Sequence, residues 1–451
     1  MGKAAPARTV ALKVLGEVRR RDGRAREILR NDSLMKGLDG RDRALVMRLV
    51  LGVVASMGLI DSFIDSHLKG RAKLEPKVRD ALRLSAFELT FLSTPPAVAV
   101  SEGVELVRSV RPKAASLANA VLRKVAQVDV PQRAEALSRV IDDQSYNVAD
   151  LALVSGYPAW LLERIAADRG EVACRLLALS ATEAAPVWVA ANRRLVTDEE
   201  ALIELEDSGL GPVAVAGHDG VFLLTRPAGL AASGLVESCH IIVSDLAAQR
   251  VAGFVATGPD GRVLEIGQGR ATKTLLIESK AARAGQTVRL CGVETEPFKV
   301  RLARRRVKTA GLGSCVSCFV LDGRDVGKDE GLPKGLSASF ETVLIDAPCT
   351  GTGTLRRHPE ISWRLAPADI SSLAALQLEL LRAAAARVAA GGTLIYATCS
   401  VLRVEDEDVV EAFLASEEGA PFVWVDPEAP GVPAIGGPDG HFCARLKRRD
   451  T

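Results

Sequence analysis

Aromatic residues are scarce in this chain of 451 residues, and long apolar runs are missing. Phe, Trp and Tyr together make up 4% of the sequence, so a broad aromatic platform for stacking bases is not expected. The longest uncharged apolar stretch near the front covers only residues 49–60, whereas a membrane helix needs about 20 such residues. The amino-terminal segment also lacks the unbroken apolar core of a signal peptide. The sequence therefore predicts neither membrane association nor secretion.

Cysteine is sparse as well, with eight residues scattered along the chain and no dense cluster. This usage is typical of reduced thiols and predicts a cytoplasmic protein. A structural metal site would need four ligands close together. No second ligand pair accompanies the cysteines discussed below, so we expect no bound metal.

The charges nearly cancel over the whole chain but not along it. The totals are 58 Lys and Arg against 56 Asp and Glu, a net charge of +2. Residues 1–130 hold 24 basic and 14 acidic residues, a net charge of +10, and the remainder has a net charge of −8. A basic front part indicates a polyanionic partner, for which RNA is the natural candidate.

Hydrophobic periodicity divides the chain into three parts. Residues 1–130 show helical spacing, for example at Val10, Val14 and Val18, which predicts an all-α helical bundle. Residues 131–240 are expected to form a helical connector and a small α+β module. Strand and helix patterns alternate over residues 241–451, which predicts an α/β domain with a mostly parallel, doubly wound sheet. Such sheets bind ligands beyond the carboxyl ends of their strands.

A glycine-containing turn follows the first expected strand of the α/β domain. Its residues are Gly267, Gln268, Gly269, Arg270, Ala271, Thr272 and Lys273. The glycines allow the backbone to approach a nucleotide-like ligand closely. The spacing matches neither the dinucleotide fingerprint nor a P-loop, and glycine is common at any turn of this kind. Ligand binding and a plain connection are therefore equally compatible with the turn.

Acidic residues end the next two expected strands. Glu294 can accept two ribose hydroxyls, or it can simply favour the dipole of the following helix. Asp322 can accept an adenine amino group, or it can cap its own loop. A glycine turn and two acids at three successive strand ends indicate a mononucleoside site, such as S-adenosylmethionine would need.

Two cysteine motifs end two further strands of the same sheet. The first is Asp346-Ala347-Pro348-Cys349, and the second is Thr398-Cys399-Ser400. Cysteines at two strand ends of one sheet can converge on one cleft. Burial in the core is the alternative, because cysteine is among the most often buried residues. A disulfide is disfavoured in the cytosol.

These two motifs together resemble those of RNA cytosine-5 methyltransferases. The chain is similar to the Sun/Fmu-type bacterial ribosomal RNA enzymes, which carry a NusB-like helical domain in front. Supporting segments run along nearly the whole chain, and they include residues 82–89, 119–123, 157–161, 245–249 and 439–442. The cysteine motifs are specific to the family, whereas the helical-domain segments are supportive.

The resemblance implies a Rossmann-like methyltransferase domain that uses S-adenosylmethionine to methylate carbon 5 of a cytosine. It implies that Cys399 is the nucleophile, that Cys349 assists product release, and that Asp346 binds the cytosine edge. A loop-capping carboxylate is the alternative for Asp346. The resemblance also implies that residues 267–273, Glu294, Asp322 and Asp346 line the cofactor site. The implied substrate is small-subunit 16S ribosomal RNA, acted on by a monomer.

The chain departs from the family at the glycine turn. The family usually has Cys-Ala-Ala-Pro-Gly-Gly-Lys there, of which only Lys273 remains, and Glu294 replaces an Asp. This departure keeps a rival open, in which the chain is a noncatalytic RNA-binding or transcription-regulatory protein with a degenerate cofactor site. A second rival keeps the chemistry and changes the substrate to transfer RNA.

Three other features have plainer interpretations. Cys315 and Cys318 form a lone CxxC on an expected strand, which favours core packing over redox chemistry. His358 follows two arginines, and phosphate contact or a structural role is expected for it. The basic helix at residues 299–308 is either a solvated face or a phosphate contact.

Overall fold

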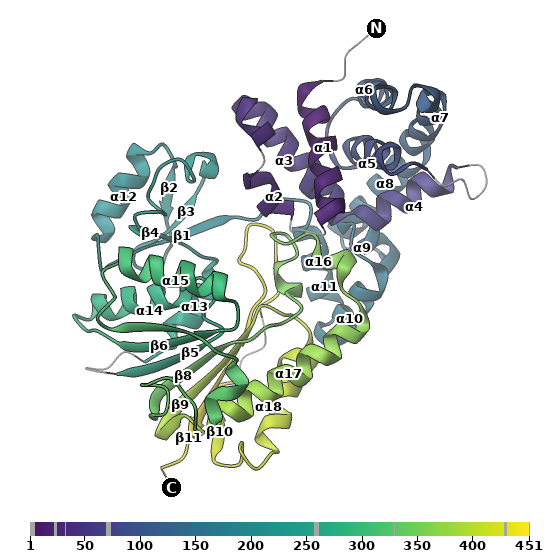
Figure 1. Cartoon of the computed structure of the whole chain (residues 1–451). Coiled ribbons are helices and arrows are strands. Elements are labelled where there is room, and N and C mark those ends of the chain that lie inside the picture. The colour runs from purple at the N-terminus through teal and green to yellow at the C-terminus, as the bar shows by residue number, and fades with distance from the viewer. Residues whose placement is uncertain are drawn as a thin grey trace. The chain divides into compact units, whose positions relative to one another are not determined.

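The computed structural model describes residues 5–21, 25–31, 33–68, 74–256, 261–328, 330–427 and 431–450. Its chain forms two compact units, which are treated separately below (Figure 1). The first unit contains residues 1–184 together with residues 355–365. The second contains residues 185–354 and 366–451. The division into residues 1–130, 131–240 and 241–451 stays a prediction.

The first unit is helical throughout the part that the structure describes. Its α-helices are α1 (Pro6–Arg21), α2 (Ala25–Asn31), α3 (Gly40–Ala55), α4 (Met57–Ser66), α5 (Pro76–Phe91), α6 (Pro96–Val110), α7 (Ala115–Lys124), α8 (Val130–Ile141), α9 (Val148–Ser155), α10 (Ala159–Arg169), α11 (Glu171–Ser180) and α16 (Ile361–Arg364). Short 3₁₀ or π segments lie at η1 (Ser33–Gly37), η2 (Pro112–Ala114) and η3 (Val125–Asp129). This confirms the predicted helical bundle in front.

Local sequence explains where several of these helices begin and end. Val14 and Val18 of α1 are buried, as the helical spacing predicts, whereas Val10 is only partly buried against the same core. Asn147 caps α9 through a capping box with Asp150, and Gly156 ends the helix in the left-handed conformation, at φ 77°. The expected connector at residues 131–180 thus forms helices that belong to the bundle unit.

Residues 355–365 follow the first cysteine motif, yet they pack within the helical unit. The indole Nε1 of Trp363 donates to the carbonyl of Ala55 at 2.9 Å and to that of Gly156 at 3.2 Å. Gly58 faces the indole ring, and a Cβ there would lie 2.0 Å from it. The missing side chain at position 58 is therefore what makes room for Trp363.

The Trp363 contact predicts an unusual cost for a small substitution. Gly58→Ala should destabilise the helical unit by about 2 kcal/mol, because overpacking of this kind typically costs about 1–3 kcal/mol. Gly16→Ala is the matched control: it also lies in a helix, and its added Cβ meets no atom within 4 Å. Urea titration, with hydrogen exchange of the α3 and α4 amides as the readout, gives the free energy of unfolding of each variant. Equal stability of the two variants would contradict the packing argument.

The second unit begins with a small α+β module. Its antiparallel sheet has the order β2-β3-β1-β4. The elements are β1 (Val187–Ala191), α12 (Asp198–Asp207), β2 (Pro212–Ala214), β3 (Val221–Leu224), η4 (Pro227–Gly229) and β4 (Ile241–Val243). Thr197 and Glu200 cap α12 reciprocally. The module predicted for this region is present.

A larger sheet, with strand order β10-β11-β9-β8-β5-β6-β7, forms the rest of the unit. Its strands are β5 (Arg262–Ile266), β6 (Arg289–Glu294), β7 (Val316–Val320), β8 (Phe340–Asp346), β9 (Val388–Thr398), β10 (Phe422–Val425) and β11 (Phe442–Arg448). Between them lie α13 (Leu246–Gly253), α14 (Thr272–Arg283), α15 (Pro297–Thr309), η5 (Gly323–Gly327), η6 (Thr352–Thr354), α17 (Pro367–Ala385), η7 (Arg403–Glu405) and α18 (Glu407–Leu414). Strands β9, β8, β5, β6 and β7 are parallel, and β11 and β10 are antiparallel.

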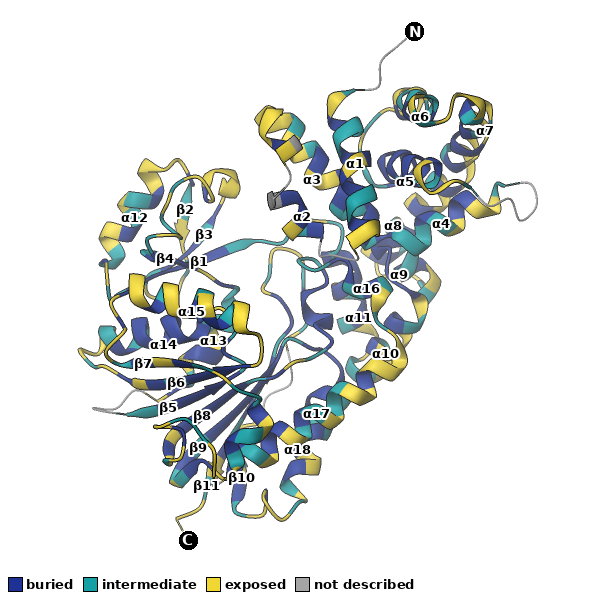
Figure 2. Ribbon diagram, in the orientation of Figure 1, coloured by how far each residue is buried: buried dark blue, intermediate teal, exposed yellow. Residues whose placement is uncertain are grey.

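Helices cover both faces of this sheet, and successive strand residues enter different cores (Figure 2). Val263 packs with α13, α14 and α15, whereas Leu264 packs with α17 and α18. This alternation follows from the pleat of a β-strand. The doubly wound, mostly parallel sheet was predicted correctly, and the antiparallel β10–β11 edge completes it.

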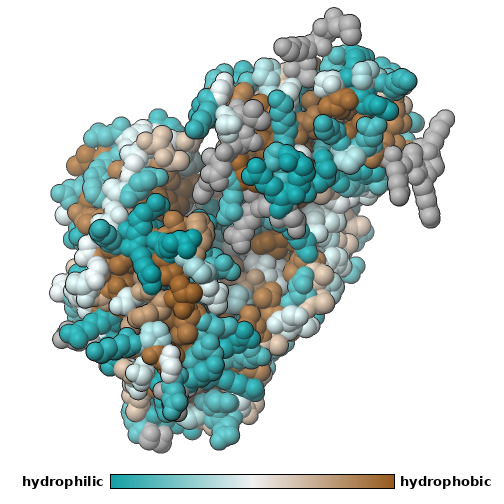
Figure 3. Space-filling view, viewed as in Figure 1, coloured by the Kyte–Doolittle hydropathy of each residue, from teal (hydrophilic) through white to brown (hydrophobic). Residues whose placement is uncertain are grey.

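In the described part of the chain, no single helix is long and apolar enough to cross a membrane. The consecutive helices α3 and α4 would reach the required length and apolar composition together, but the chain bends sharply between them. Val46, Leu49, Ile60 and Ile64 of this pair are buried in the core of the helical unit. On the visible face of the molecule, hydrophobic residues occur in patches among hydrophilic ones (Figure 3).

Candidate functional site

The site lies along the carboxyl edge of the parallel strands. The glycine turn follows β5, Glu294 ends β6, and Asp322 follows β7. These three strands are neighbours in that order. Asp346 ends β8 on the other side of β5, and Cys399 follows β9 beside it. Every residue singled out in the sequence for the cofactor or the chemistry therefore lies at one edge of one sheet.

The glycine turn closes tightly against the neighbouring strands. The amides of Gly267 and Gln268 both donate to the carbonyl of Val293 at 3.0 Å. Gly267 has a φ of 79°, and a Cβ on it would lie 2.2 Å from the carbonyl oxygen of Asp346. The glycine predicted a close approach to the backbone, and in the structure the backbone of Asp346 makes that approach.

The side chains of the turn point in different directions. Gln268 is buried and donates to the Thr274 hydroxyl at 3.0 Å, in space that Gly292 leaves open. Ala271 is buried and left-handed, at φ 61°, where the turn enters α14. Arg306 of the basic helix α15 donates to the Arg270 carbonyl at 2.8 Å and to the Thr272 hydroxyl at 3.0 Å. One arginine of that helix therefore braces the turn.

Glu294 is almost fully buried and binds the glycine turn. Its Oε2 accepts from the Gly269 amide at 3.0 Å, and its Oε1 accepts from the Glu296 amide at 3.0 Å. Thr295 and Lys299 also donate to Oε1, at 3.2 and 3.4 Å. A carboxylate has about four lone-pair sites, so Oε2 retains capacity for a ligand hydroxyl.

Asp322 caps its own loop. It accepts from the Arg324 amide at 2.9 Å and pairs with the Arg324 guanidinium at 2.7 Å. The hydrogen bond from Arg324 lowers the pKa of the Asp322 carboxyl. Asp322 thus performs the loop-capping role, and its contact with adenine stays a prediction.

Lys273 and Asp346 form an ion pair in the centre of the edge. The ammonium Nζ lies 2.6 Å from Asp346 Oδ2. Burial alone would lower the pKa of Lys273, but the charge and the hydrogen bond of Asp346 outweigh it, and the pKa is raised. The Lys273 side chain is 10% exposed and that of Asp346 36%. The pair therefore presents a partly open carboxylate beside the glycine turn.

The two motif cysteines meet directly. The Sγ atoms of Cys349 and Cys399 are 3.2 Å apart, and the Cys399 amide donates to Cys349 Sγ at 3.3 Å. Both residues are half-buried. The hydrogen bond with Cys399, together with burial, raises the pKa of the Cys349 thiol well above its ordinary value. The raised pKa favours the protonated form of Cys349.

Three buried groups behind this edge are not among the residues predicted from the sequence. Glu405 is fully buried and binds the residues that follow both cysteines. Burial raises the pKa of Glu265 to about 8, although the Thr274 hydroxyl donates to it. Burial and the charge of Lys273 lower the pKa of His441 to about 4. The only signal for Glu405 was its position as the first acid after Cys399.

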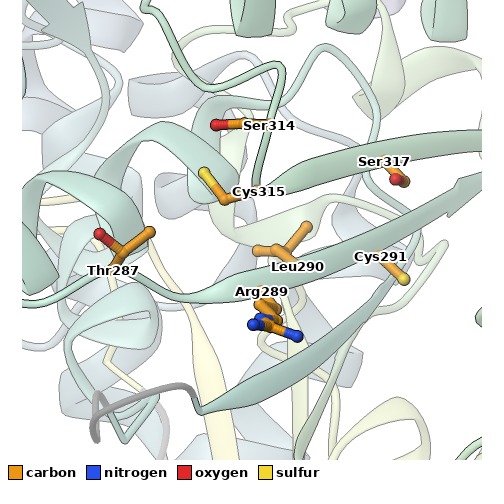
Figure 4. Close-up of a pocket in the computed structure, with 7 residues that line it drawn as sticks. All are labelled: Thr287, Arg289, Leu290, Cys291, Ser314, Cys315 and Ser317. Carbon is orange, nitrogen blue, oxygen red and sulfur yellow. The ribbon is translucent and has the colours of Figure 1, made fainter.

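A separate surface hollow of about 420 Å³ lies at the opposite, amino ends of β6 and β7 (Figure 4). Its lining residues are Thr287, Arg289, Leu290, Cys291, Ser314, Cys315 and Ser317. Cys318 of the CxxC sequence is buried, and Cys315 lines the hollow. The hollow is thus not part of the site at the carboxyl edge.

The carboxyl edge fits a mononucleoside sulfonium cofactor. Gly267 and Gly269 are both left-handed, which keeps side chains out of the turn, and Glu294 fixes the turn while keeping an oxygen lone pair for a ribose hydroxyl. Such a turn on a mostly parallel sheet with an antiparallel edge is the arrangement expected of an S-adenosylmethionine-dependent methyltransferase.

Comparisons with known proteins agree. The model of the family described as 16S rRNA methyltransferase RsmB/F matches residues 257–431, and that of the NusB family matches residues 5–127. A Mycobacterium tuberculosis protein named as a methyltransferase is 32% identical over 403 residues, covering 88% of this chain and 83% of its own. Ribosomal RNA small subunit methyltransferase B of Escherichia coli is 28% identical over 422 residues, covering 92% and 93%.

Solved structures share the fold. One crystal structure aligns over 98% of this chain and 99% of its own, with a TM-score of 0.75 and 21% identity. NSun6 from Pyrococcus horikoshii, solved with the ligand SFG, covers 66% of this chain and 100% of its own, with a TM-score of 0.55 and 15% identity. The chain belongs to the RsmB/F methyltransferase family, and it is an RNA methyltransferase that uses S-adenosylmethionine.

The Gly267 contact predicts a specific loss of cofactor binding. Gly267→Ala should weaken S-adenosylmethionine binding roughly tenfold or more, because the methyl group meets the Asp346 carbonyl and the left-handed conformation is strained by about 1–2 kcal/mol. Gly285→Ala is the matched control, since Gly285 is also left-handed, at φ 66°, and its added Cβ meets nothing within 4 Å. Isothermal titration calorimetry measures both. Equal weakening in the two variants would refute a local effect.

Proposed function

We propose that this protein methylates carbon 5 of a cytosine in RNA, through a covalent adduct between Cys399 and the base. The observation that supports this most directly is the 3.2 Å separation of two thiols beside a carboxylate at the edge that would hold the cofactor. S-adenosylmethionine, when bound, supplies an electrophilic methyl group. The residues of the chain activate the base and then release it.

The need for a thiol follows from the chemistry of cytosine. Carbon 5 is a poor nucleophile, but a thiolate that adds to carbon 6 makes carbon 5 enamine-like, and carbon 5 can then attack the methyl group. This is covalent catalysis, in which one hard step becomes two easier ones. Loss of the proton from carbon 5 restores the double bond, and the carbon 6–sulfur bond breaks. We assign the attacking sulfur to Cys399.

Cys349 is assigned to the release step. Its raised pKa keeps a proton on this sulfur, and its Sγ lies 3.2 Å from that of Cys399. A donor in this position stabilises the departing thiolate of Cys399. Asp346 is assigned to the cytosine edge: its Oδ2 binds Lys273, and the second oxygen of this half-exposed carboxyl can accept from the base amino group.

The substrate that we propose is 16S ribosomal RNA, bound by a cytoplasmic monomer. The relatives named ribosomal RNA small subunit methyltransferase B support this choice. The net charge of +10 over residues 1–130 supports a role of the helical unit in gripping RNA phosphates. The target base must leave any stack, because a thiol cannot reach carbon 6 inside one.

Two measurements separate this proposal from its rivals. Bisulfite sequencing of ribosomal and transfer RNA from a deletion strain tells which RNA loses a 5-methylcytosine. Calorimetric titration with S-adenosylmethionine tests the noncatalytic alternative, which predicts no detectable heat. If only a transfer RNA loses a 5-methylcytosine, the substrate is transfer RNA and not ribosomal RNA, while the proposed cytosine-5 chemistry is retained.

Removal of the nucleophile should abolish the reaction. Cys399→Ala should lower the methylation rate by roughly a thousandfold or more, because no other group can form the adduct. Cys291→Ala is the control: it removes a half-buried thiol from the other end of the same sheet. Transfer of a radiolabelled methyl group to RNA gives the rates. Normal methylation by the Cys399 variant would exclude this sulfur as the nucleophile.

Removal of the second thiol should trap the intermediate. Cys349→Ala should accumulate a protein–RNA adduct that survives denaturation, because the departing thiolate loses its hydrogen-bond donor. A denaturing gel with labelled RNA and S-adenosylmethionine detects the adduct. The double variant lacking both thiols should show none. A Cys349 variant that turns over without accumulating an adduct would contradict the release role.

A further inference from the structure

Glu405 is a buried carboxylate directly behind the two thiols. It ends η7, just after the second cysteine motif, and its exposure is 0%. Burying a carboxylate costs several kcal/mol unless hydrogen bonds compensate it. The side chain therefore requires partners, and the identity of these partners suggests what it does.

Four donors surround this carboxylate. Oε1 accepts from the Thr350 amide at 2.9 Å and from Gln377 Nε2 at 3.1 Å. Oε2 accepts from the Thr350 hydroxyl at 2.5 Å and from the Ser400 hydroxyl at 2.6 Å. These contacts match the acceptor capacity of a carboxylate. Both oxygens are thus compensated by residues of the two cysteine loops and of α17.

The partners are the immediate chain neighbours of the two thiols. Thr350 directly follows Cys349, and Ser400 directly follows Cys399. Gln377 also donates to the carbonyl of Pro348, at 2.8 Å, on the other side of Cys349. One carboxylate therefore fixes the backbone beside both sulfurs.

The same network joins the two loops to each other. The Gly353 amide donates to the Cys399 carbonyl at 2.9 Å, and the Val401 amide donates to the Thr352 hydroxyl at 3.0 Å. Thr352 and Ser400 hydroxyls lie 3.2 Å apart. A shift of one loop thus has to move the other unless these bonds break, and Glu405 adds a buried anchor that binds both loops.

We propose that Glu405 is a positioning residue, which holds Cys349 and Cys399 in the mutual geometry that addition and release require. This inference rests on the proposed function of the two cysteines. The hydrogen bonds of Glu405 to the cysteine loops go to Thr350 and Ser400, the residues beside the two sulfurs, and it holds the thiols through them. Its charge also contributes to the raised pKa of Cys349. Tight positioning of this kind matters because displacements of about 1 Å can cost about 100-fold in rate.

The substitution Glu405→Gln tests the proposal, because it keeps the size and shape of the side chain but turns one acceptor oxygen into a donor. The new NH₂ group of the glutamine then faces a group that itself donates, either a hydroxyl or an N–H group. We expect kcat for RNA methylation to fall roughly 10- to 100-fold, while KM for RNA and the affinity for S-adenosylmethionine change less than about twofold. Glu405→Asp keeps the charge and should recover part of kcat.

Glu278→Gln provides the matched control. Glu278 is also fully buried in this unit, but it pairs with Arg194 and not with the cysteine loops. A general loss of stability should affect both glutamine variants alike, whereas a positioning role affects kcat only in Glu405→Gln. An equal fall of kcat in the two variants would overturn the proposal.

A readout without turnover separates this inference from the proposed function. Iodoacetamide alkylation as a function of pH, followed by mass spectrometry, gives the reactivity of each thiol. Glu405→Gln should change the profiles of Cys399 and Cys349 severalfold and leave that of Cys291 unchanged. Unchanged profiles at both motif cysteines would overturn the positioning role, even in a protein that methylates RNA.

Two milder variants cover a failure of Glu405→Gln to fold. Ser400→Ala removes the hydroxyl beside Cys399, which donates to Glu405 and accepts from the Leu402 amide, and Thr350→Val removes the hydroxyl beside Cys349. Each should alter the alkylation profile of its own neighbouring cysteine more than that of the other. If neither profile moves, Glu405 does not position the thiols. If wild-type protein makes no 5-methylcytosine, the proposed function fails, and the alkylation result still decides the role of Glu405.

Discussion

The close approach between the glycine turn and the end of β8 is the constraint on which the site depends. Gly267 has no side chain, so the carbonyl of Asp346 can lie where a Cβ would be. Lys273, at the end of the same turn, reaches the Asp346 carboxylate at 2.6 Å. Parallel strands end at one edge, and these two contacts hold the glycine turn against the end of β8, which leads into the first cysteine motif.

The same edge contains several buried carboxylates. Glu265, Glu294 and Glu405 all lie in or behind the edge with little or no exposure. Glu265 accepts from Thr274 in the first turn of α14, Glu294 accepts from the glycine turn, and Glu405 accepts from the cysteine loops. Buried carboxylates weaken a fold when they are left unpaired, so the loops and the carboxylates have to be formed together. Polar networks of this kind give a rigid and specific arrangement when every member is satisfied.

Much of the fold could be predicted because its signals are local. Helical spacing in the front part, and alternating strands and helices behind it, lie within windows of ten to twenty residues. The proximity of Cys349 and Cys399 could be predicted from their sequence positions because strand ends in such a sheet converge, and the two sulfurs lie 3.2 Å apart. The packing of residues 355–365 in the helical unit could not be predicted, because the contacts of Trp363 join residues about 200 to 300 positions apart and have no local pattern. The inward turn of Gln268 and the hydrogen bonds of Glu405 also depend on other segments of the chain, because Gly292 leaves the space for Gln268 and the Thr350 amide donates to Glu405.

The acids of the cofactor edge show that structural and functional interpretations of a residue need not exclude each other. Glu294 was open to two interpretations, as a ribose acceptor or as a carboxylate that serves the local chain. Its hydrogen bond to the Gly269 amide is a local role, and it also fixes that carboxylate in one place beside the turn. An acceptor whose rotamer is already ordered loses less conformational entropy when a ligand hydroxyl binds. The local hydrogen bond is therefore compatible with the ribose-binding role that we predict for Glu294.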